Sequence, residues 1–159
     1  MTGEFVQWML DTFSKGESDA RLAIELRPVV DTNDQRFDRR MSTLAGFVES
    51  FKSPYVGVCW DIANTLASAS QPNLPSENEF RLINHVHLHD RHAGGGGLHA
   101  PLGSHGLPWQ TAIAHLQPMR WSGDITLEIR YRYASEEGEP WSVLADSIHH
   151  VRSVLTTRE

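Results

Sequence analysis

The sequence contains one cysteine, Cys59, so the chain cannot form an internal disulfide. Cys59 lies in an apolar segment, where we expect buried packing and not a reactive nucleophile. No apolar run approaches the roughly 20 residues that a membrane-spanning helix needs. The N-terminus also lacks the basic region and hydrophobic core of a secretion signal. We therefore expect a soluble, cytoplasmic protein with no membrane partner.

Positive charge is scarce as well. The chain has 14 lysines and arginines against 20 aspartates and glutamates, which gives a formal charge of -6 and a pI near 5.8. Proteins that bind nucleic acid carry a basic surface, so nucleic acid is a disfavoured partner. With 159 residues, 40% of them hydrophobic, the chain can bury one core. We expect a single domain over residues 1–159.

Strand and helix patterns alternate along the chain. Strands are predicted at 21–26, 55–61, 83–89 and 124–129, and helices around 5–13, 37–51, 108–116 and 141–155. The stretch after residue 61 is helical but interrupted near two prolines, Pro72 and Pro75. Residues 91–107, with four glycines at 94–97, are predicted to form a long loop. Strands separated by helices predict parallel βα units.

Each predicted strand has one aliphatic face and one small or polar face. In the second strand, Val58 and Trp60 alternate with Cys59 and Asp61, and the other strands behave alike. An open sheet covered by helices on both sides would be aliphatic on both faces. The pattern instead favours the wall of a barrel, aliphatic toward its helices and polar toward its lumen.

Four potential metal ligands, Glu25, Asp61, His87 and Glu128, stand at or near the ends of the four strands. The carboxyl ends of parallel strands meet at one rim, so these residues are predicted to converge. Three carboxylates and an imidazole suit one divalent ion, Mn²⁺ or Mg²⁺ in preference to Co²⁺ or Zn²⁺. Taken singly, Glu25 could be a solvated strand end, Asp61 a helix cap and His87 a hydrogen-bonded core histidine.

Several other polar residues are candidates for the same rim. Arg27 could hold a substrate phosphate or carboxylate, or form a salt bridge at the rim. His99 could contact substrate or be a solvated loop residue. His89, with Asp90, could support the ligands from behind or anchor the loop.

Five short runs together resemble the second half of the xylose isomerase-like TIM barrels, a superfamily of sugar and sugar-phosphate isomerases and epimerases, inosose dehydratases and zinc apurinic endonucleases. The runs occur in the expected order with βα spacing and cover nearly the whole chain: residues 24–28 (IELRP), 56–64 (VGVCWDIAN), 85–90 (HVHLHD), 99–103 (HAPLG) and 123–129 (GDITLEI). The resemblance implies an α/β fold, a parallel (βα)4 half of a TIM barrel with strands five to eight and flanking helices.

The resemblance also implies a function. Positions matching Glu25, Asp61, His87 and Glu128 bind the ion in the isomerases and epimerases, and the matching glutamates move a proton through an enediolate of a ketose. Glu25 and Glu128 would then be the catalytic acid and base. The substrate would be a small sugar, sugar phosphate or related polyol ketone. Asn64, where the family often has a histidine, could hydrogen-bond a substrate hydroxyl.

Departures from the family pattern keep alternatives open. Asn64 and Gly97 replace residues that the endonuclease branch uses, so an apurinic endonuclease is less expected, as is an inosose dehydratase. A truncated, non-catalytic remnant that keeps the fold and perhaps the ion is the main alternative. Four strands cannot close a barrel, so we expect a homodimer, a separately encoded half-barrel that completes the sheet, or a fragment of marginal stability.

Overall fold

The computed structural model describes residues 3–14, 20–28, 36–67, 74–92, 97–103, 106–116 and 121–156. Within these ranges, every helix is too short or too polar to span a lipid bilayer. The elements in chain order are α1 (Gly3–Ser14), β1 (Leu22–Glu25), the 3-10 helix η1 (Phe37–Arg39), α2 (Met41–Glu49), β2 (Val56–Asp61), α3 (Ile62–Ala67), α4 (Glu77–Phe80), β3 (Ile83–Leu88), β4 (Asp90–Arg91), β5 (Leu98–Ala100), α5 (Trp109–Ala114), β6 (Asp124–Leu127), α6 (Tyr131–Glu137) and α7 (Pro140–Thr156).

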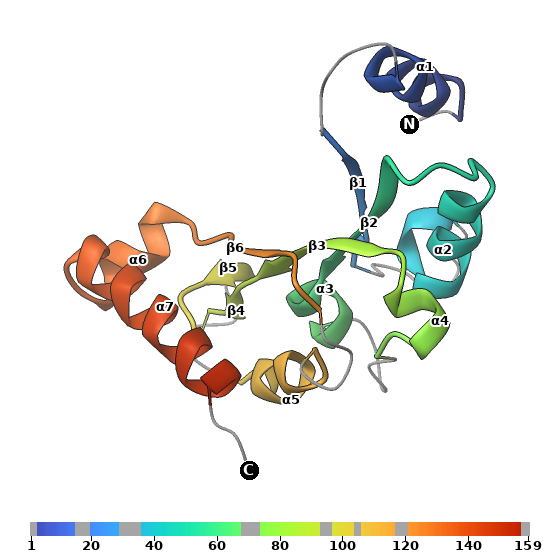
Figure 1. Ribbon diagram of the computed structural model, residues 1–159. Coiled ribbons are helices and arrows are strands. Elements are labelled where there is room, and N and C mark those ends of the chain that lie inside the picture. Colours follow the sequence, from blue (N-terminus) through green and yellow to red (C-terminus); the bar gives the residue numbers. More distant parts are fainter. Residues whose placement is uncertain are drawn as a thin grey trace.

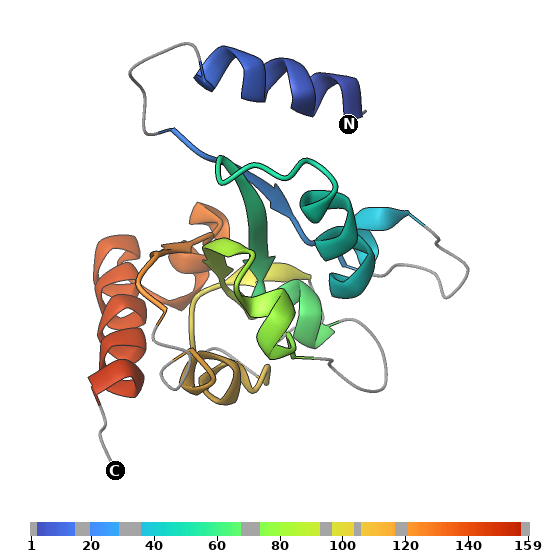
Figure 2. The ribbon, with the colours of Figure 1, turned by 45° about the vertical axis from the view of Figure 1, so that its right-hand side comes forward.

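Four strands form a parallel sheet in the order β1-β2-β3-β6 (Figure 1). They are the four strands predicted from the sequence, each shorter by one or two residues. Helices α2 to α5 lie along one face of the sheet, and α6 and α7 follow β6 at one end (Figures 1 and 2). This is the architecture of half a TIM barrel, as predicted.

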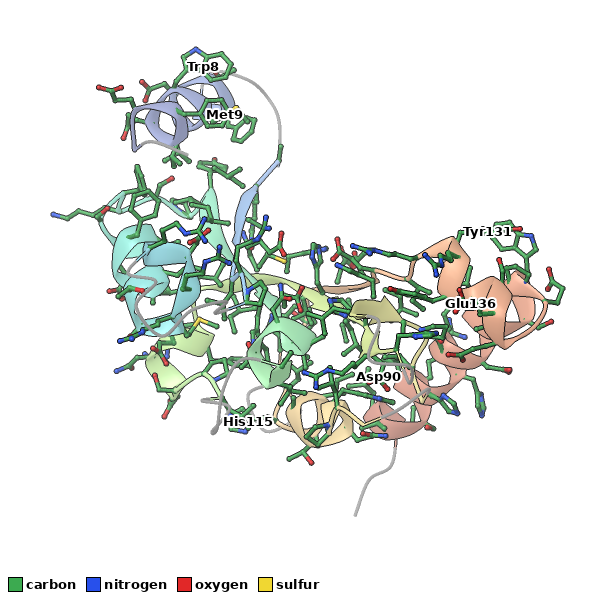
Figure 3. The ribbon with its side chains drawn as sticks, turned by 180° about the vertical axis from the view of Figure 1, so that it is seen from behind. Trp8, Met9, Asp90, His115, Tyr131 and Glu136 are labelled. Carbon is green, nitrogen blue, oxygen red and sulfur yellow. The ribbon has the colours of Figure 1, made fainter. Side chains whose placement is uncertain are left out.

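The two faces of the sheet differ as the alternation predicted. The aliphatic face packs against the helices, and Val58, Trp60, Val86 and Leu88 on it are fully buried. No described helix lies over the opposite face (Figure 3), where His85 is only partly buried and Thr126 is exposed, although Cys59 and Asp61 are buried. The polar face of the half-barrel is therefore only partly covered, and it carries the candidate site.

A register shift between β2 and β3 is accommodated by a glycine. Val58 pairs with Ile83 and Cys59 pairs with His85, so Asn84 is the extra residue of the bulge. A Cβ atom on Gly57 would lie 2.6 Å from the Asn84 side chain and 2.8 Å from the Leu82 carbonyl oxygen. Glycine is therefore required at this crossing, and it lets the Asn84 amide reach the Leu22 carbonyl at 3.2 Å.

The segment predicted as a long loop contains a short antiparallel hairpin, β4 with β5. Three backbone N–H groups, those of Arg91, Gly103 and Leu107, donate to the buried carboxylate of Asp90 at 2.7–3.2 Å. Strands of two and three residues are too short to show an alternating pattern, which is why the sequence did not reveal them. Gly94 to Gly96, part of the glycine run, lie outside the described residues.

Two helices differ from their predicted form. Arg40 is extended (φ -132°, ψ 134°), so the predicted helix over 37–51 is divided into η1 and α2. The apolar stripe of α7 is only partly buried: Val151 is buried, whereas Trp141 is 75% exposed and Ile148 is also exposed. Helix α6, which the sequence did not predict, adds Tyr131 to this exposed surface.

Candidate metal centre

The register of the sheet brings the four predicted ligands to one level of the half-barrel. Glu25 pairs with Cys59, while Asp61 pairs with His87 two residues further along β2. Glu128 lies two residues beyond Thr126, the partner of His87. Counted along the strand direction, the ligand position thus shifts by about four residues from β1 to β6. All four ligand positions lie on the polar face of the sheet. Strands of a barrel tilt against its axis, so this stagger keeps the side chains at a common height.

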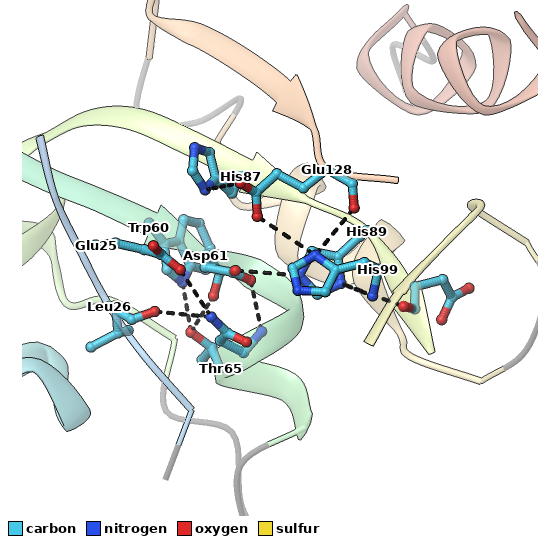
Figure 4. Close-up of polar contacts among 11 residues, drawn as sticks. Glu25, Leu26, Trp60, Asp61, Thr65, His87, His89, His99 and Glu128 are labelled. Carbon is cyan, nitrogen blue, oxygen red and sulfur yellow. Dashed lines mark hydrogen bonds and ion pairs between the residues drawn. The ribbon is translucent and has the colours of Figure 1, made fainter. Parts of the chain in front are cut away.

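The four side chains converge (Figure 4). One potential ligand atom from each of Glu25, Asp61, His87 and Glu128 lies within 4.8 Å of the others. His87 Nδ1 is 3.4 Å from Glu128 Oε1, but it is buried and makes no hydrogen bond with the described residues. An unsatisfied buried imidazole nitrogen among carboxylates fits a cation site better than a hydrogen-bonded core histidine.

Electrostatics at the cluster point the same way. Burial raises the pKa of Glu25, and the negative charges of Asp61 and Glu128 raise it further, against a smaller lowering by Arg27 and His87. The crowded carboxylates therefore repel one another when no cation is present. A divalent ion would offset this repulsion and favour the ionised carboxylates, so the residues present fit such an ion. Their role as ligands stays a prediction.

Asp61 is fully buried and both of its carboxylate oxygens are engaged. Oδ1 accepts the backbone N–H of Asn64 at 2.8 Å, which caps the first turn of α3. Oδ2 lies 3.3 Å from His89 Nε2. Asp61 can therefore cap α3 and also belong to the cluster. Both are possible because the two oxygens of a carboxylate offer about four lone-pair sites.

Asn64 is buried beside the first ligand. Its side-chain Nδ2 donates to Glu25 Oε1 at 3.4 Å and to the Leu26 carbonyl at 3.3 Å. Asn64 thus ties the end of β1 to α3 and orients the Glu25 carboxylate. Its predicted contact with substrate stays a prediction.

His99 and Arg27 lie at the edge of the cluster. His99, in β5, has a left-handed backbone (φ 74°), which is rare for a residue other than glycine. Its Nδ1 is 3.3 Å from the Glu128 carbonyl oxygen and 3.7 Å from Glu128 Oε2. Burial lowers the pKa of His99, and so does the His89 ring. Arg27 is exposed, and its charge reaches Glu25.

Other residues of the polar face are structural. The His85 ring packs edge-on against His87 at 5.1 Å between ring centroids, and its Nε2 lies 3.0 Å from the Thr126 hydroxyl. Cys59 is buried, which raises the pKa of its thiol and argues against a nucleophile. His89 is the residue whose importance the sequence left unresolved; the alternating run His85, His87, His89 was the available signal.

Comparisons with known proteins agree with this fold. A model of the family described as xylose isomerase-like TIM barrel matches residues 16–153. Solved structures similar to the chain include the 3-keto-D-glucoside 4-epimerase of E. coli, with 14% identity and a TM-score of 0.65. An L-ribulose 3-epimerase has 12% identity and a TM-score of 0.64, and a D-allulose 3-epimerase from Methylomonas sp. has 11% and 0.62.

The extent of the similarity is informative. These matches cover 93%, 86% and 85% of this chain but 51%, 48% and 49% of the three epimerases, in that order. The chain spans about half the length of the solved structures it matches, as expected of half a barrel. At such identities the likeness establishes the fold alone. No curated protein gives a significant match.

Proposed function

Because the chain belongs to the xylose isomerase-like TIM barrel family, we propose that it is a divalent-metal-dependent isomerase or epimerase acting on a small sugar, sugar phosphate or related polyol ketone. One observation carries the proposal: Glu25, Asp61, His87 and Glu128 place their ligand atoms within 4.8 Å of one another on the polar face of the half-barrel. Mn²⁺ or Mg²⁺ suits a set of three carboxylates and one imidazole.

The two glutamates would carry the proton transfer. One of them would take the proton from the carbon next to the substrate carbonyl, and the other would return a proton. A divalent ion bound beside them would polarise the carbonyl and hydroxyl oxygens of the substrate.

Three further residues are proposed to contact the substrate. His99 lies against Glu128, where its ring could donate a hydrogen bond to a substrate hydroxyl. Asn64 adjoins Glu25, and exposed Arg27 offers a positive charge for a phosphate or carboxylate. The neighbours are named for L-ribulose and D-allulose, so ketoses of this size are the first substrates to test.

The test combines ion binding with hydrogen exchange. Titration calorimetry should show Mn²⁺ binding that is weakened on the order of tenfold or more by His87→Ala and unchanged by His149→Ala on exposed α7. With Mn²⁺ present, ketoses incubated in D2O should gain deuterium at the carbon next to the carbonyl, measured by mass spectrometry. Glu128→Gln should abolish the gain, and Glu49→Gln, an exposed change on α2, should not.

Two outcomes would change the proposal. Exchange that survives in both Glu25→Gln and Glu128→Gln would remove the two glutamates from the proton transfer. Ion binding with no exchange of any ketose would favour the alternative function, a chain that keeps the fold and the ion but does not turn over substrate.

The open edges of the sheet call for a partner. Strands β1 and β6 are the two ends of the sheet, and neither pairs on its outer side with a described residue. We propose that a second set of parallel strands, from another copy of the chain or from a complementary half-barrel, completes the wall. Exposed aromatic residues beyond both edges, Trp8 on α1 and Tyr131 and Trp141 on α6 and α7, support this proposal.

A further inference from the structure

His89 is a fully buried polar residue directly after β3, on the same face of the chain as His87. It lies within reach of the cluster, and one of its ring nitrogens falls within 4.8 Å of ligand atoms of His99 and Glu128. A buried imidazole here could be a metal ligand, or it could support a ligand. The hydrogen bonds around the ring distinguish the two roles.

The first of these bonds fixes the proton on the ring. The backbone N–H of His99 donates to His89 Nδ1 at 3.0 Å. A backbone N–H can only donate, so Nδ1 must be an acceptor and carries no proton. The Asp90 carbonyl, 3.4 Å from the same nitrogen, is therefore a contact and not an acceptor of a hydrogen bond. The single ring proton must lie on Nε2.

The second bond connects this proton to the cluster. Nε2 lies 3.3 Å from Asp61 Oδ2, and both side chains are fully buried. The Nε2–H thus donates to a carboxylate in a dry environment, where such a bond is strengthened. Both ring nitrogens are engaged, so His89 has no lone pair left for an ion.

The hairpin holds the ring in this orientation. His99 belongs to β5, and the strained backbone of this residue (φ 74°) points its N–H at His89. Asp90, next in the chain, binds three N–H groups of the following segment and secures the start of the hairpin. The rings of His89 and His99 also pack at 4.2 Å.

We propose that His89 is a positioning residue of the ion site: its Nε2–H holds Asp61 Oδ2, so that Asp61, fixed at its other oxygen by the Asn64 N–H, presents its remaining lone pairs to a divalent cation. This inference rests on the proposed function, because it assumes that Asp61 is a ligand. Groups that orient a metal ligand commonly change ion affinity by about 10- to 100-fold when they are removed.

The experiment measures ion affinity and the tautomer separately. Mn²⁺ titration calorimetry of the wild type, His89→Leu, His89→Gln and His115→Leu gives the affinities. His89→Leu should bind about tenfold more weakly or worse. His89→Gln, whose amide can replace the Nε2–H donor, should recover much of the loss. His115→Leu is the matched control, because His115 is half-buried in a distant turn after α5. Long-range ¹H–¹⁵N NMR of the ion-free wild type should show His89 protonated at Nε2 alone.

Each result decides something definite. Equal Mn²⁺ affinity of His89→Leu and the wild type would overturn the inference, as would a His89 protonated at Nδ1. Failure of His89→Leu to fold leaves the decision to His89→Gln and to the NMR tautomer. A wild type that binds no ion overturns the proposed function, and the positioning role toward an ion falls with it; the NMR spectrum then still reports whether His89 holds Asp61.

Discussion

Three carboxylates lie close together in the candidate metal centre, and their proximity affects the pKa of Glu25. Its pKa is raised by burial first, and then by the charges of Asp61 and Glu128. The folded, ion-free protein therefore binds the Glu25 proton more tightly than the unfolded chain does. This contribution to stability is present below the ordinary glutamate pKa of 4.5 and is lost as the pH rises through the higher pKa of the folded state.

Replacing Glu25 tests this balance. In the ion-free protein, Glu25→Gln should be more stable than the wild type at about pH 7.5, because glutamine cannot ionise beside Asp61 and Glu128. The advantage should disappear at about pH 4, where Glu25 is protonated in the wild type. Urea denaturation in EDTA at the two pH values measures the difference.

Two comparisons sharpen the result. Glu49→Gln, an exposed change on α2, should give no such pH-dependent difference. Saturating Mn²⁺ should reverse the order, because an ion that binds the native state stabilises the wild type and binds poorly without the Glu25 carboxylate. A wild type that remains more stable than Glu25→Gln in EDTA at neutral pH would contradict the account of Glu25.

The register of the strands determines where the side chains of the site lie, and the bulge between β2 and β3 contributes to that register. Asn84 occupies the extra position, and the register beyond it pairs Asp61 with His87. Gly57 makes room for the Asn84 amide, whose Nδ2 also reaches the Leu22 carbonyl on β1. The absence of a side chain at Gly57 on β2 thus permits the hydrogen bond from Asn84 on β3 to Leu22 on β1.

A pair of glycine substitutions tests this packing. Gly57→Ala should destabilise the protein by about 1–3 kcal/mol, because its Cβ would lie 2.6 Å from Asn84 and 2.8 Å from the Leu82 backbone. Gly46→Ala in α2, where a Cβ meets nothing within 4 Å, should stabilise it by about 0.5–1 kcal/mol. Urea denaturation measures both. Equal stability of the two variants would show that the crossing at Gly57 is not tightly packed.

The molecule as a whole has an open sheet with apolar surface beyond each end. Trp8 on α1 is 59% exposed and Tyr131 on α6 is 73% exposed, and they lie at opposite ends of the molecule (Figure 3). Trp141 belongs to the same end as Tyr131, on a face of α7 that has no described partner. Exposed aromatic residues beside unpaired strands are typical of surfaces that bind another chain.

We expect the purified chain to associate through these ends. Sedimentation equilibrium should show association at micromolar concentration. Trp8→Glu or Trp141→Glu should weaken this association on the order of tenfold, because tryptophans that become buried in an interface often contribute most of its binding energy. Gln110→Glu, which adds the same charge at an exposed position of α5, is the control. A monodisperse monomer would contradict association of this chain with itself and would leave a complementary half-barrel as the proposed partner.

The fold was predictable because its signals are local. Alternation within four short segments distinguished the helix-facing residues Val58, Trp60, Val86 and Leu88 from the polar face, and the ends of the strands indicated the ligand positions. Elements with weak patterns escaped prediction. Helix α6 buries only Tyr133 and Ala134, and the hairpin strands have two and three residues.

Local patterns were thus enough to predict the order of strands and helices, the polarity of each face and the four residues at the rim. How these residues meet depends on the packing of the chain in three dimensions. His89 and Asp61 are 28 positions apart, and nothing in either segment indicates that one would hold the other. That contact depends on the stagger of parallel strands and on where the hairpin places the His99 N–H, and both arise from long-range packing, which no short stretch of sequence encodes.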